Sequence, residues 1–313
     1  MFAAVQLAPR DPILGMTEAF NADTRTNKVN LGVGVYYDDN GKLPLLAAVR
    51  EAEKTRLAAA PARGYLPIEG FGAYNQAVQQ LLFGKDSPLL AAGRVATFEA
   101  LGGTGGLKIG ADFLKRLAPN AEVWISDPSW ENHRALFEGA GFKVNAYPYF
   151  DSATHGVNFQ GMLAALNAMP AGSIVVLHAC CHNPTGVDLS VAQWKQVVAT
   201  VRERDLVAFL DMAYQGFGDG IDADALALRK FADSGLDFFV SSSFSKSFSL
   251  YGERVGALSI VTADRDETAR VISQVKRVIR TSYSNPPTHG AAIVAAVLST
   301  PALRQLWEKE LAG

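Results

Sequence analysis

The sequence predicts an α/β fold built on a mostly parallel sheet of seven strands with helices on both faces. Seven apolar stretches are typical of strands, at 95–100, 122–126, 143–148, 173–179, 206–210, 237–242 and 256–261. Amphipathic stretches separate many of them, at 104–117, 131–140, 159–168 and 191–204. Because parallel strands need a long crossover, usually a helix, this alternation indicates an α–β–α sandwich.

The remaining elements follow in chain order. Residues 1–44 are rich in turn formers and predict an irregular arm. An Ala-rich helix is expected at 45–60, and a second at 73–83 that ends at Gly84. The final stretch is helical, with a break at Pro301. In the helix at 191–204 one apolar stripe is expected, formed by Val191, Trp194, Val197, Val198 and Val201.

Composition and charge exclude several classes of protein. The formal net charge of −2 gives no basic field for nucleic acid, and no apolar run approaches the ~20 residues of a membrane span. The opening MFAAVQLAPRDP is too short and polar for a signal peptide. Cys180 and Cys181 are adjacent and offer no disulfide framework, and the five histidines show no metal-ligand spacing beside them. We expect a cytoplasmic enzyme without a metal.

The first candidate binding feature is a glycine-rich loop after the strand at 95–100. The stretch LGGTGGLKIG presents free backbone N–H groups at the start of a helix, and Thr104 adds a hydroxyl. It is not a P-loop, and Lys108 occupies the last position of a G-x-G-x-x-G pattern. The loop predicts an anion site, with a plain tight turn as the alternative.

Three further strands end in candidate residues. Trp130, after 122–126, can stack on a flat ring or fill the core between helix and sheet. In CCHNPTG, Pro184 favours an extended Asn183 whose amide leaves the sheet, unless this is a simple turn. Asp211 closes an apolar run, where a carboxylate needs a cation or donor, although a helix N-cap is an alternative.

The last of these sites follows the strand at 237–242. Lys246 lies among small hydroxyl residues in SSSFSKSFSLYGERVG, and Arg254 comes eight residues later. The alternative is a lysine whose ammonium reaches water. Together the strand ends meet the needs of pyridoxal 5′-phosphate (PLP), which has a phosphate, a flat ring, a ring nitrogen, a ring hydroxyl and an aldehyde for a lysine.

Eight motifs resemble, in order, those of the class I, fold-type I aminotransferases, in the branch of the aspartate and aromatic-amino-acid enzymes. They are LGVGVYYDDNGKLP, GYLPIEG, GGTGGL, DPSWENH, CCHNPTG, DMAYQGF, SFSKSFSLYGERVG and RTSYSNPP. The resemblance implies a fold-type I PLP-dependent transferase. It assigns 1–44 to an N-terminal arm and the first part of a small domain, and 45–313 to the large PLP-binding domain.

The resemblance also implies catalytic roles for three residues. Lys246 binds the aldehyde of PLP covalently and then moves a proton between substrate and cofactor. Asp211 pairs with the pyridinium nitrogen, while Tyr214 and Asn183 bond the ring's phenolic oxygen. Burial and Arg254 are expected to lower the pKa of Lys246, as base chemistry requires.

The other implied roles concern the phosphate, the substrate and a second subunit. Gly103, Thr104, Ser243 and Arg254 hold the phosphate, and Trp130 stacks on the ring. Tyr65 is expected to reach the phosphate of a neighbouring subunit, which implies a homodimer, and Arg280 to receive an acidic substrate's side-chain carboxylate across the interface. The residues expected to bind substrate are Gly34, Tyr65, Trp130, Asn183 and Arg280.

The residues expected at the mouth of the substrate pocket predict the substrate preference. Aspartate-selective members tend to have lysine and threonine where this chain has Tyr37 and Leu43, as in the aromatic branch, although Asn285 follows the aspartate pattern. Apolar groups there favour a phenyl ring over a charge. We expect transamination of tyrosine or phenylalanine with 2-oxoglutarate, with residual activity on aspartate and glutamate. Aspartate aminotransferase is the alternative.

Family chains continue beyond Gly313 and supply there the arginine for the substrate's α-carboxylate, a motif that Arg304 does not match. The resemblance therefore predicts an incomplete small domain, a truncated form of a longer enzyme, and weak transamination. Three other readings stay open. They are a nicotinamide-dependent Rossmann dehydrogenase, a large domain that binds PLP without turnover, and a β-lyase or decarboxylase of the same fold type.

Overall fold

The computed structural model describes residues 2–7, 14–30, 34–38 and 41–313. The chain divides into two compact units, Met1–Pro44 and Leu45–Gly313. This division falls at the predicted boundary, whereas the assignment of the first unit to a small domain stays a prediction. None of the described helices combines the length and apolar character that a bilayer crossing requires.

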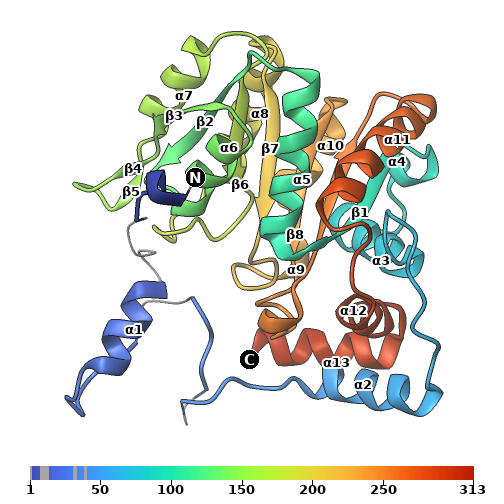
Figure 1. Ribbon diagram of the computed structural model, residues 1–313. Helices are drawn as coiled ribbons and strands as arrows, with labels where there is room; N and C mark the ends of the chain where they lie inside the picture. The colour runs from blue at the N-terminus through green and yellow to red at the C-terminus, as the bar shows by residue number, and fades with distance from the viewer. Residues whose placement is uncertain (1, 8–13, 31–33, 39–40) are drawn as a thin grey trace. The chain divides into compact units, whose positions relative to one another are not determined.

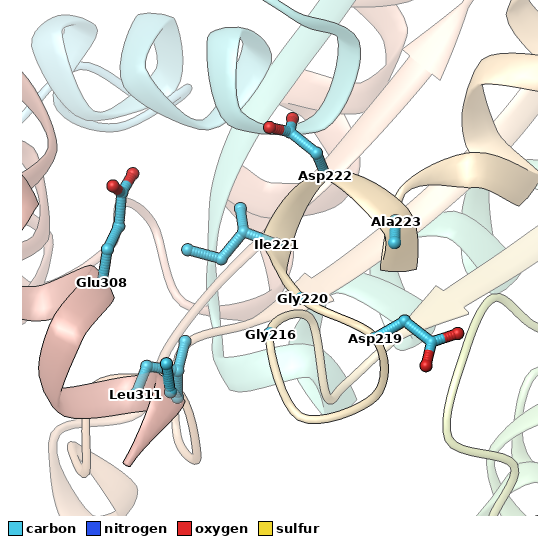
Figure 2. A pocket seen from close by; sticks show the side chains of 9 residues that line it. Gly216, Asp219, Gly220, Ile221, Asp222, Ala223, Glu308 and Leu311 are labelled. Carbon is cyan, nitrogen blue, oxygen red and sulfur yellow. The ribbon is translucent and has the colours of Figure 1, made fainter.

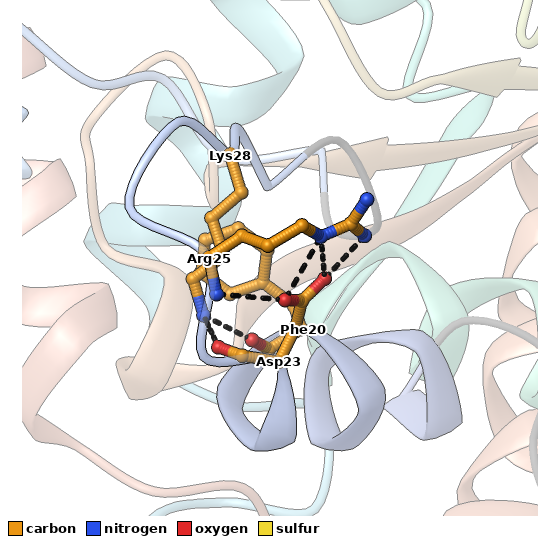
Figure 3. A network of polar contacts seen from close by, with 4 residues as sticks. All are labelled: Phe20, Asp23, Arg25 and Lys28. Carbon is orange, nitrogen blue, oxygen red and sulfur yellow. Dashed lines mark hydrogen bonds and ion pairs between the residues drawn. The ribbon is translucent and has the colours of Figure 1, made fainter.

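The first unit contains more regular structure than the turn-rich sequence predicts. It holds the 3-10 helix η1 (Phe2–Ala4) and the helix α1 (Leu14–Ala22). After α1, the ammonium of Lys28 donates to the carbonyls of Phe20 and Asp23, while Arg25 pairs with the Asp23 carboxylate (Figure 3). Cations near the last carbonyls stabilise a helix end, which accounts for the regular structure here.

The second unit is organised around one seven-stranded sheet. Its strands are β1 (Val95–Leu101), β2 (Glu122–Asp127), β3 (Lys143–Pro148), β6 (Ile174–His178), β7 (Val207–Met212), β8 (Phe238–Ser243) and β9 (Val255–Val261). They run in the order β1-β9-β8-β7-β6-β2-β3, and only β9 is antiparallel to its neighbours. The predicted mostly parallel sheet is confirmed. A small hairpin joins β4 (Phe150–Asp151) to β5 (Gly156–Val157).

Helices cover both faces, as the α–β–α prediction requires (Figure 1). One face packs against α5 (Gly102–Leu117), α6 (Glu131–Gly139) and α11 (Arg265–Ser282). The other packs against α3 (Gly72–Phe83), α7 (Phe159–Ala168), α8 (Val191–Glu203), α10 (Leu226–Ser234) and α12 (His289–Ser299). Each face has its own apolar core.

Two further helices, α2 (Ala47–Ala59) and α13 (Pro301–Ala312), pack on α12. The Glu310 carboxylate accepts the backbone N–H groups of Ala47 and Ala48, at 2.6 and 3.1 Å. A side chain from the far end of the chain thus caps α2, whose start lies two residues inside the predicted one. The short elements are α4 (Pro88–Ala91), α9 (Ile221–Asp224) and η2 (Tyr251–Glu253).

Two details differ from the sequence prediction. The apolar stripe of α8 is buried at Trp194, Val197, Val198 and Val201, but Val191 is 49% exposed because it begins the helix and extends beyond the core. The helices α10 and α11 were not predicted. Asp264 caps α11 by accepting the N–H of Glu267 at 2.7 Å, a signal that the sequence does contain.

Candidate active site

Three neighbouring strands bring polar side chains together where they end. His178 of β6 pairs in register with Asp211 of β7, which pairs with Ser241 of β8. Successive side chains of a strand alternate between the faces, and Phe209 packs in the core under α5 and α6. Asp211, two residues later, therefore points to the same face, at the carboxyl edge where open α/β sheets bind ligands.

Asp211 is 5% exposed and is bonded to a histidine that the sequence analysis did not single out. His133, in the first turns of α6, is fully buried, and its Nε2 lies 2.8 Å from Asp211 Oδ2. A carboxylate only accepts hydrogen bonds, so Nε2 donates. The available signal was the last residue of DPSWENH, three positions after Trp130 on the same helix face.

Further imidazoles continue from this pair. The His178 ring lies 5.0 Å from that of His133 and 4.2 Å from that of His182, which stacks on Tyr149 at 3.9 Å. Burial and the two neighbouring imidazoles hold the pKa of His178 well below its usual value, and burial lowers the pKa of His182 to about 4. Both rings are therefore neutral at pH 7.

Lys246 is positioned by its apolar neighbours. Phe244 and Phe248, two residues to either side, are buried in the core, and the intervening backbone forms a turn with Ser249 N–H donating to Lys246 O at 3.0 Å. Trp307 of α13 stacks on Phe248 and donates from Nε1 to Ser247 O at 2.6 Å. These contacts leave the Lys246 side chain half-buried with Nζ 4.6 Å from the Tyr214 ring centre.

The electrostatics suit a lysine that must be a nucleophile or base. Burial lowers the pKa of Lys246, the Asp211 carboxylate opposes this change, and the Arg254 guanidinium lowers the pKa further. Burial and the same carboxylate raise the pKa of the Tyr214 hydroxyl. At neutral pH Tyr214 can therefore donate a hydrogen bond.

The glycine loop forms an anion cradle with Arg254. Gly102 begins α5 with φ +70°, and a Cβ there would lie 2.5 Å from Arg254 Nη2. A Cβ on Gly103 would lie 3.1 Å from Ser243 Cβ, and Ser241 Oγ donates to Gly103 O at 2.8 Å. The positive end of a 16-residue helix, a guanidinium and a hydroxyl thus converge, which is a donor set that fits a phosphate.

The other predicted residues fall into two groups. Thr104 is in the first turn of α5, and Asn183 is half-buried in the turn after β6. Trp130 is the N-cap residue of α6 and lies edge-on to His133, with ring centres 5.3 Å apart. Trp130 also packs on the core, as the alternative interpretation expects, whereas stacking on a bound ring stays a prediction.

The second group comprises Tyr65, Arg280 and Gly34. Tyr65 is 95% exposed, and Arg280, near the end of α11, is exposed and donates to Ser284. No contact among the described residues joins either one to Lys246. Gly34 belongs to the first unit.

A separate cavity of about 450 Å³ lies between the α9 loop and α13 (Figure 2). Its lining includes Gly216, Asp219, Asp222, Glu308 and Leu311. Neither Lys246 nor Arg254 lines it, and its carboxylates do not suit a phosphate. The residues predicted to bind the cofactor at the strand ends therefore lie outside the lining of this cavity.

Residues 26–312 match the family model of aminotransferases of class I and II. The chain belongs to this family. It is 70% identical over 311 residues to "Aspartate aminotransferase" of Pseudomonas aeruginosa, covering 99% of this chain and 78% of the relative. It is 53% identical over 313 residues to "Aromatic-amino-acid aminotransferase" of Escherichia coli, covering 99% and 79%.

A solved structure of this aminotransferase family carries the cofactor. An aromatic-amino-acid aminotransferase from Burkholderia pseudomallei, covalently bound to pyridoxal phosphate, superposes with a TM-score of 0.98 at 70% identity, covering all of this chain and 78% of that one. The predicted family and fold are confirmed. The relatives' names divide between aspartate and aromatic substrates.

Proposed function

We propose that this chain transfers the amino group of an aromatic amino acid to 2-oxoglutarate, using PLP bound at Lys246, and that it also accepts aspartate and glutamate. The proposal rests on the position of Lys246, whose pKa is lowered by burial. It lies beside the buried Asp211–His133 pair and the Gly102–Arg254 cradle. This combination supports a lysine that acts as nucleophile and base next to a bound phosphate. PLP, when bound, supplies an electron sink for the substrate's α-carbon.

Each residue of the proposed site has its own role in binding the cofactor or moving a proton. Arg254, Ser243, Gly103 and Thr104 bind the phosphate at the start of α5. Asp211, held by His133 Nε2, keeps a proton on the ring nitrogen, because a buried carboxylate favours a cation beside it.

Around the ring, Tyr214 would donate to the phenolic oxygen, Asn183 would share that contact, and Trp130 would exclude water from the ring. With PLP bound, the Lys246 amine would be the base that accepts the proton of the substrate's α-carbon at Nζ. Its lowered pKa keeps a larger neutral fraction for this purpose.

Substitution of Lys246 tests the assignment. We expect Lys246→Ala to bind PLP without the covalent bond and to lose turnover. The control Lys195→Ala, on the exposed face of α8, should keep both the covalent bond to PLP and the turnover. Borohydride reduction followed by mass measurement detects the covalent bond in the unaltered chain and should detect none in Lys246→Ala. Near-normal turnover in Lys246→Ala would contradict the proposed mechanism.

Aspartate aminotransferase is the second candidate, favoured by the name of the relative from Pseudomonas aeruginosa. Against it, Tyr37 and Leu43 are 49% and 45% exposed and offer apolar surface in the first unit. Adding phenylalanine or aspartate to the PLP-loaded chain and following the cofactor absorbance compares the two substrates. We expect Tyr37→Lys with Leu43→Thr to shift the preference towards aspartate. A strong aspartate preference before substitution would overturn the aromatic assignment.

We also propose a cytoplasmic homodimer with shared active sites. The family resemblance supports it, together with the exposed positions of Tyr65 and Arg280, which are available to a second subunit. Sedimentation of the chain measures the assembly. Mixing Tyr65→Phe subunits with Lys246→Ala subunits should restore part of the activity if each active site draws on both chains.

A further inference from the structure

Three sulfur atoms gather behind the proposed active site. Cys180 and Cys181 follow β6 after one intervening residue, Ala179, and Met212 is the last residue of β7. The backbone continues the sheet here, since Ala179 N–H donates to Asp211 O at 2.9 Å. The two cysteines are the only ones in the chain.

Cys180 Sγ lies near each of the other two sulfur atoms. Cys180 Sγ lies 3.5 Å from Met212 Sδ. The Sγ atoms of Cys180 and Cys181 and a carboxylate oxygen of Asp224 all lie within 4.8 Å of one another. Cys180, Met212 and Asp224 are 7%, 1% and 6% exposed, while Cys181 is half-buried and gives access from outside.

The backbone around the cluster is held in an unusual conformation. Cys181 has φ +48°, in the left-handed region that a residue with a Cβ rarely adopts. The Asp188 carboxylate holds it there by accepting the N–H groups of Cys181 and His182, at 2.6 and 2.8 Å. This conformation turns adjacent side chains, which otherwise point to opposite faces of a strand, toward one site.

Asp224 closes the other side of the cluster. Its oxygens accept the N–H groups of Gly216, Gly218 and Asp219, at 2.7, 3.0 and 2.9 Å. A carboxylate offers about four lone-pair positions, so these three bonds leave one. A Cβ on Gly218 would lie 2.6 Å from Asp224 Oδ1 and 3.4 Å from Cys181 Sγ, so glycine keeps this approach open.

We propose that Cys180, Cys181 and Met212 form a binding site for one soft monovalent cation of the Cu(I) type, with Asp224 at its edge. Thiolate and thioether sulfurs are the ligands that such ions prefer, whereas harder divalent ions prefer nitrogen and oxygen. On binding, each coordinating thiol releases its proton to solvent, the metal–sulfur bonds form, and no electron is transferred.

The position of the site connects it to catalysis, a consequence that rests on the proposed function. Asn183 follows Cys181 by two residues, and Cys181 Sγ lies 4.0 Å from Tyr214 O. An ion that draws the two thiols together therefore shifts the turns that carry Asn183 and Tyr214, both proposed to bond the cofactor ring. The loaded site is inhibitory.

Silver(I), a redox-inert ion of the same class, tests the proposal on the PLP-loaded chain. We expect one Ag(I) per chain to survive gel filtration in the presence of excess glutathione, and none in Cys180→Ser or Cys181→Ser. Met212→Leu keeps both thiols and should bind at least about tenfold more weakly, the loss that even indirect partners of a metal ligand produce. Met162→Leu, a buried methionine of α7, is the matched control.

A second measurement does not depend on the variants' folding. In the unaltered chain, bound Ag(I) should protect Cys181 from maleimide labelling. Failure to retain the ion, retention that both serine variants share, or equal affinity in Met212→Leu and the unaltered chain would overturn the site. Retained binding with full transaminase activity would overturn the inhibitory role alone, and a failed Lys246 test would leave the binding result standing.

Discussion

Because the Glu99 carboxyl group is buried, we predict that this protein becomes less stable as pH rises towards neutrality. The side chain lies in the middle of β1 and is 2% exposed. Its Oε2 accepts the Phe71 N–H at 2.9 Å, and a Cβ on Gly70 would lie 2.7 Å from the same oxygen. Burial raises the pKa of Glu99 from 4.5 to about 7, while the Phe71 N–H opposes the rise.

Within the described part of the chain, no cation is paired with the Glu99 carboxylate. Tyr74 and Tyr283 pack beside it and are acids whose pKa values its charge raises further, in each case after the larger effect of burial. Lys276 is 2.7 Å from Glu69, with which it forms its ion pair. An ionised Glu99 is therefore buried with one backbone donor.

The sign and size of this pH dependence of the unfolding free energy follow from proton linkage. Between pH 4.5 and about 7 the folded chain keeps a proton on Glu99 that the unfolded chain releases. The stabilisation is complete below pH 4.5 and is lost as pH rises to about 7. At about 1.4 kcal/mol per pH unit, this window corresponds to about 3 kcal/mol of unfolding free energy.

Glu99→Gln isolates this contribution, because glutamine resembles the protonated acid and can still accept the Phe71 N–H. Urea unfolding at pH 5 and pH 8 should show that the variant gains about 3 kcal/mol over the unaltered chain at the higher pH. Glu203→Gln, exposed at the end of α8, corrects for removal of a charge. A difference between Glu99→Gln and the unaltered chain that is equal at both pH values would refute the burial argument.

Two further predictions concern the cradle and the support of Lys246. Gly102→Ala should weaken PLP binding by about tenfold or more in a fluorescence titration, because its Cβ meets Arg254 and its φ is positive. Gly84→Ala, also at positive φ but with open space around it, should leave PLP affinity unchanged, and equal losses would contradict the steric reason. Trp307→Phe should lower the unfolding free energy by about 1–3 kcal/mol, since Ser247 O loses its donor. Trp124 Nε1 has no hydrogen-bond partner among the described residues, so Trp124→Phe should lower the unfolding free energy by less. A larger loss in Trp124→Phe than in Trp307→Phe would disprove the role of the Trp307–Ser247 hydrogen bond.

Much of the large unit could be predicted because strands and crossover helices leave a strong periodic signal. Each of the seven predicted strands lies within two residues of an observed one. The helix α11 was missed although Asp264, Glu267 and Arg280 carry its end signals, because its apolar positions are sparse among charged residues. The helix α1 was missed because turn formers surround it and its end depends on Lys28.

The sequence by itself determined the family, the order of the elements and the chemical types at the strand ends, because motif order and periodicity are properties of neighbouring residues. Only the tertiary structure decided that His133 meets Asp211 and that Gly102 faces Arg254, pairs that lie 78 and 152 positions apart. It also decided that Cys180 approaches Met212. Contacts of this kind arise where strands distant in the chain become neighbours in the sheet, and local pattern carries no record of that pairing.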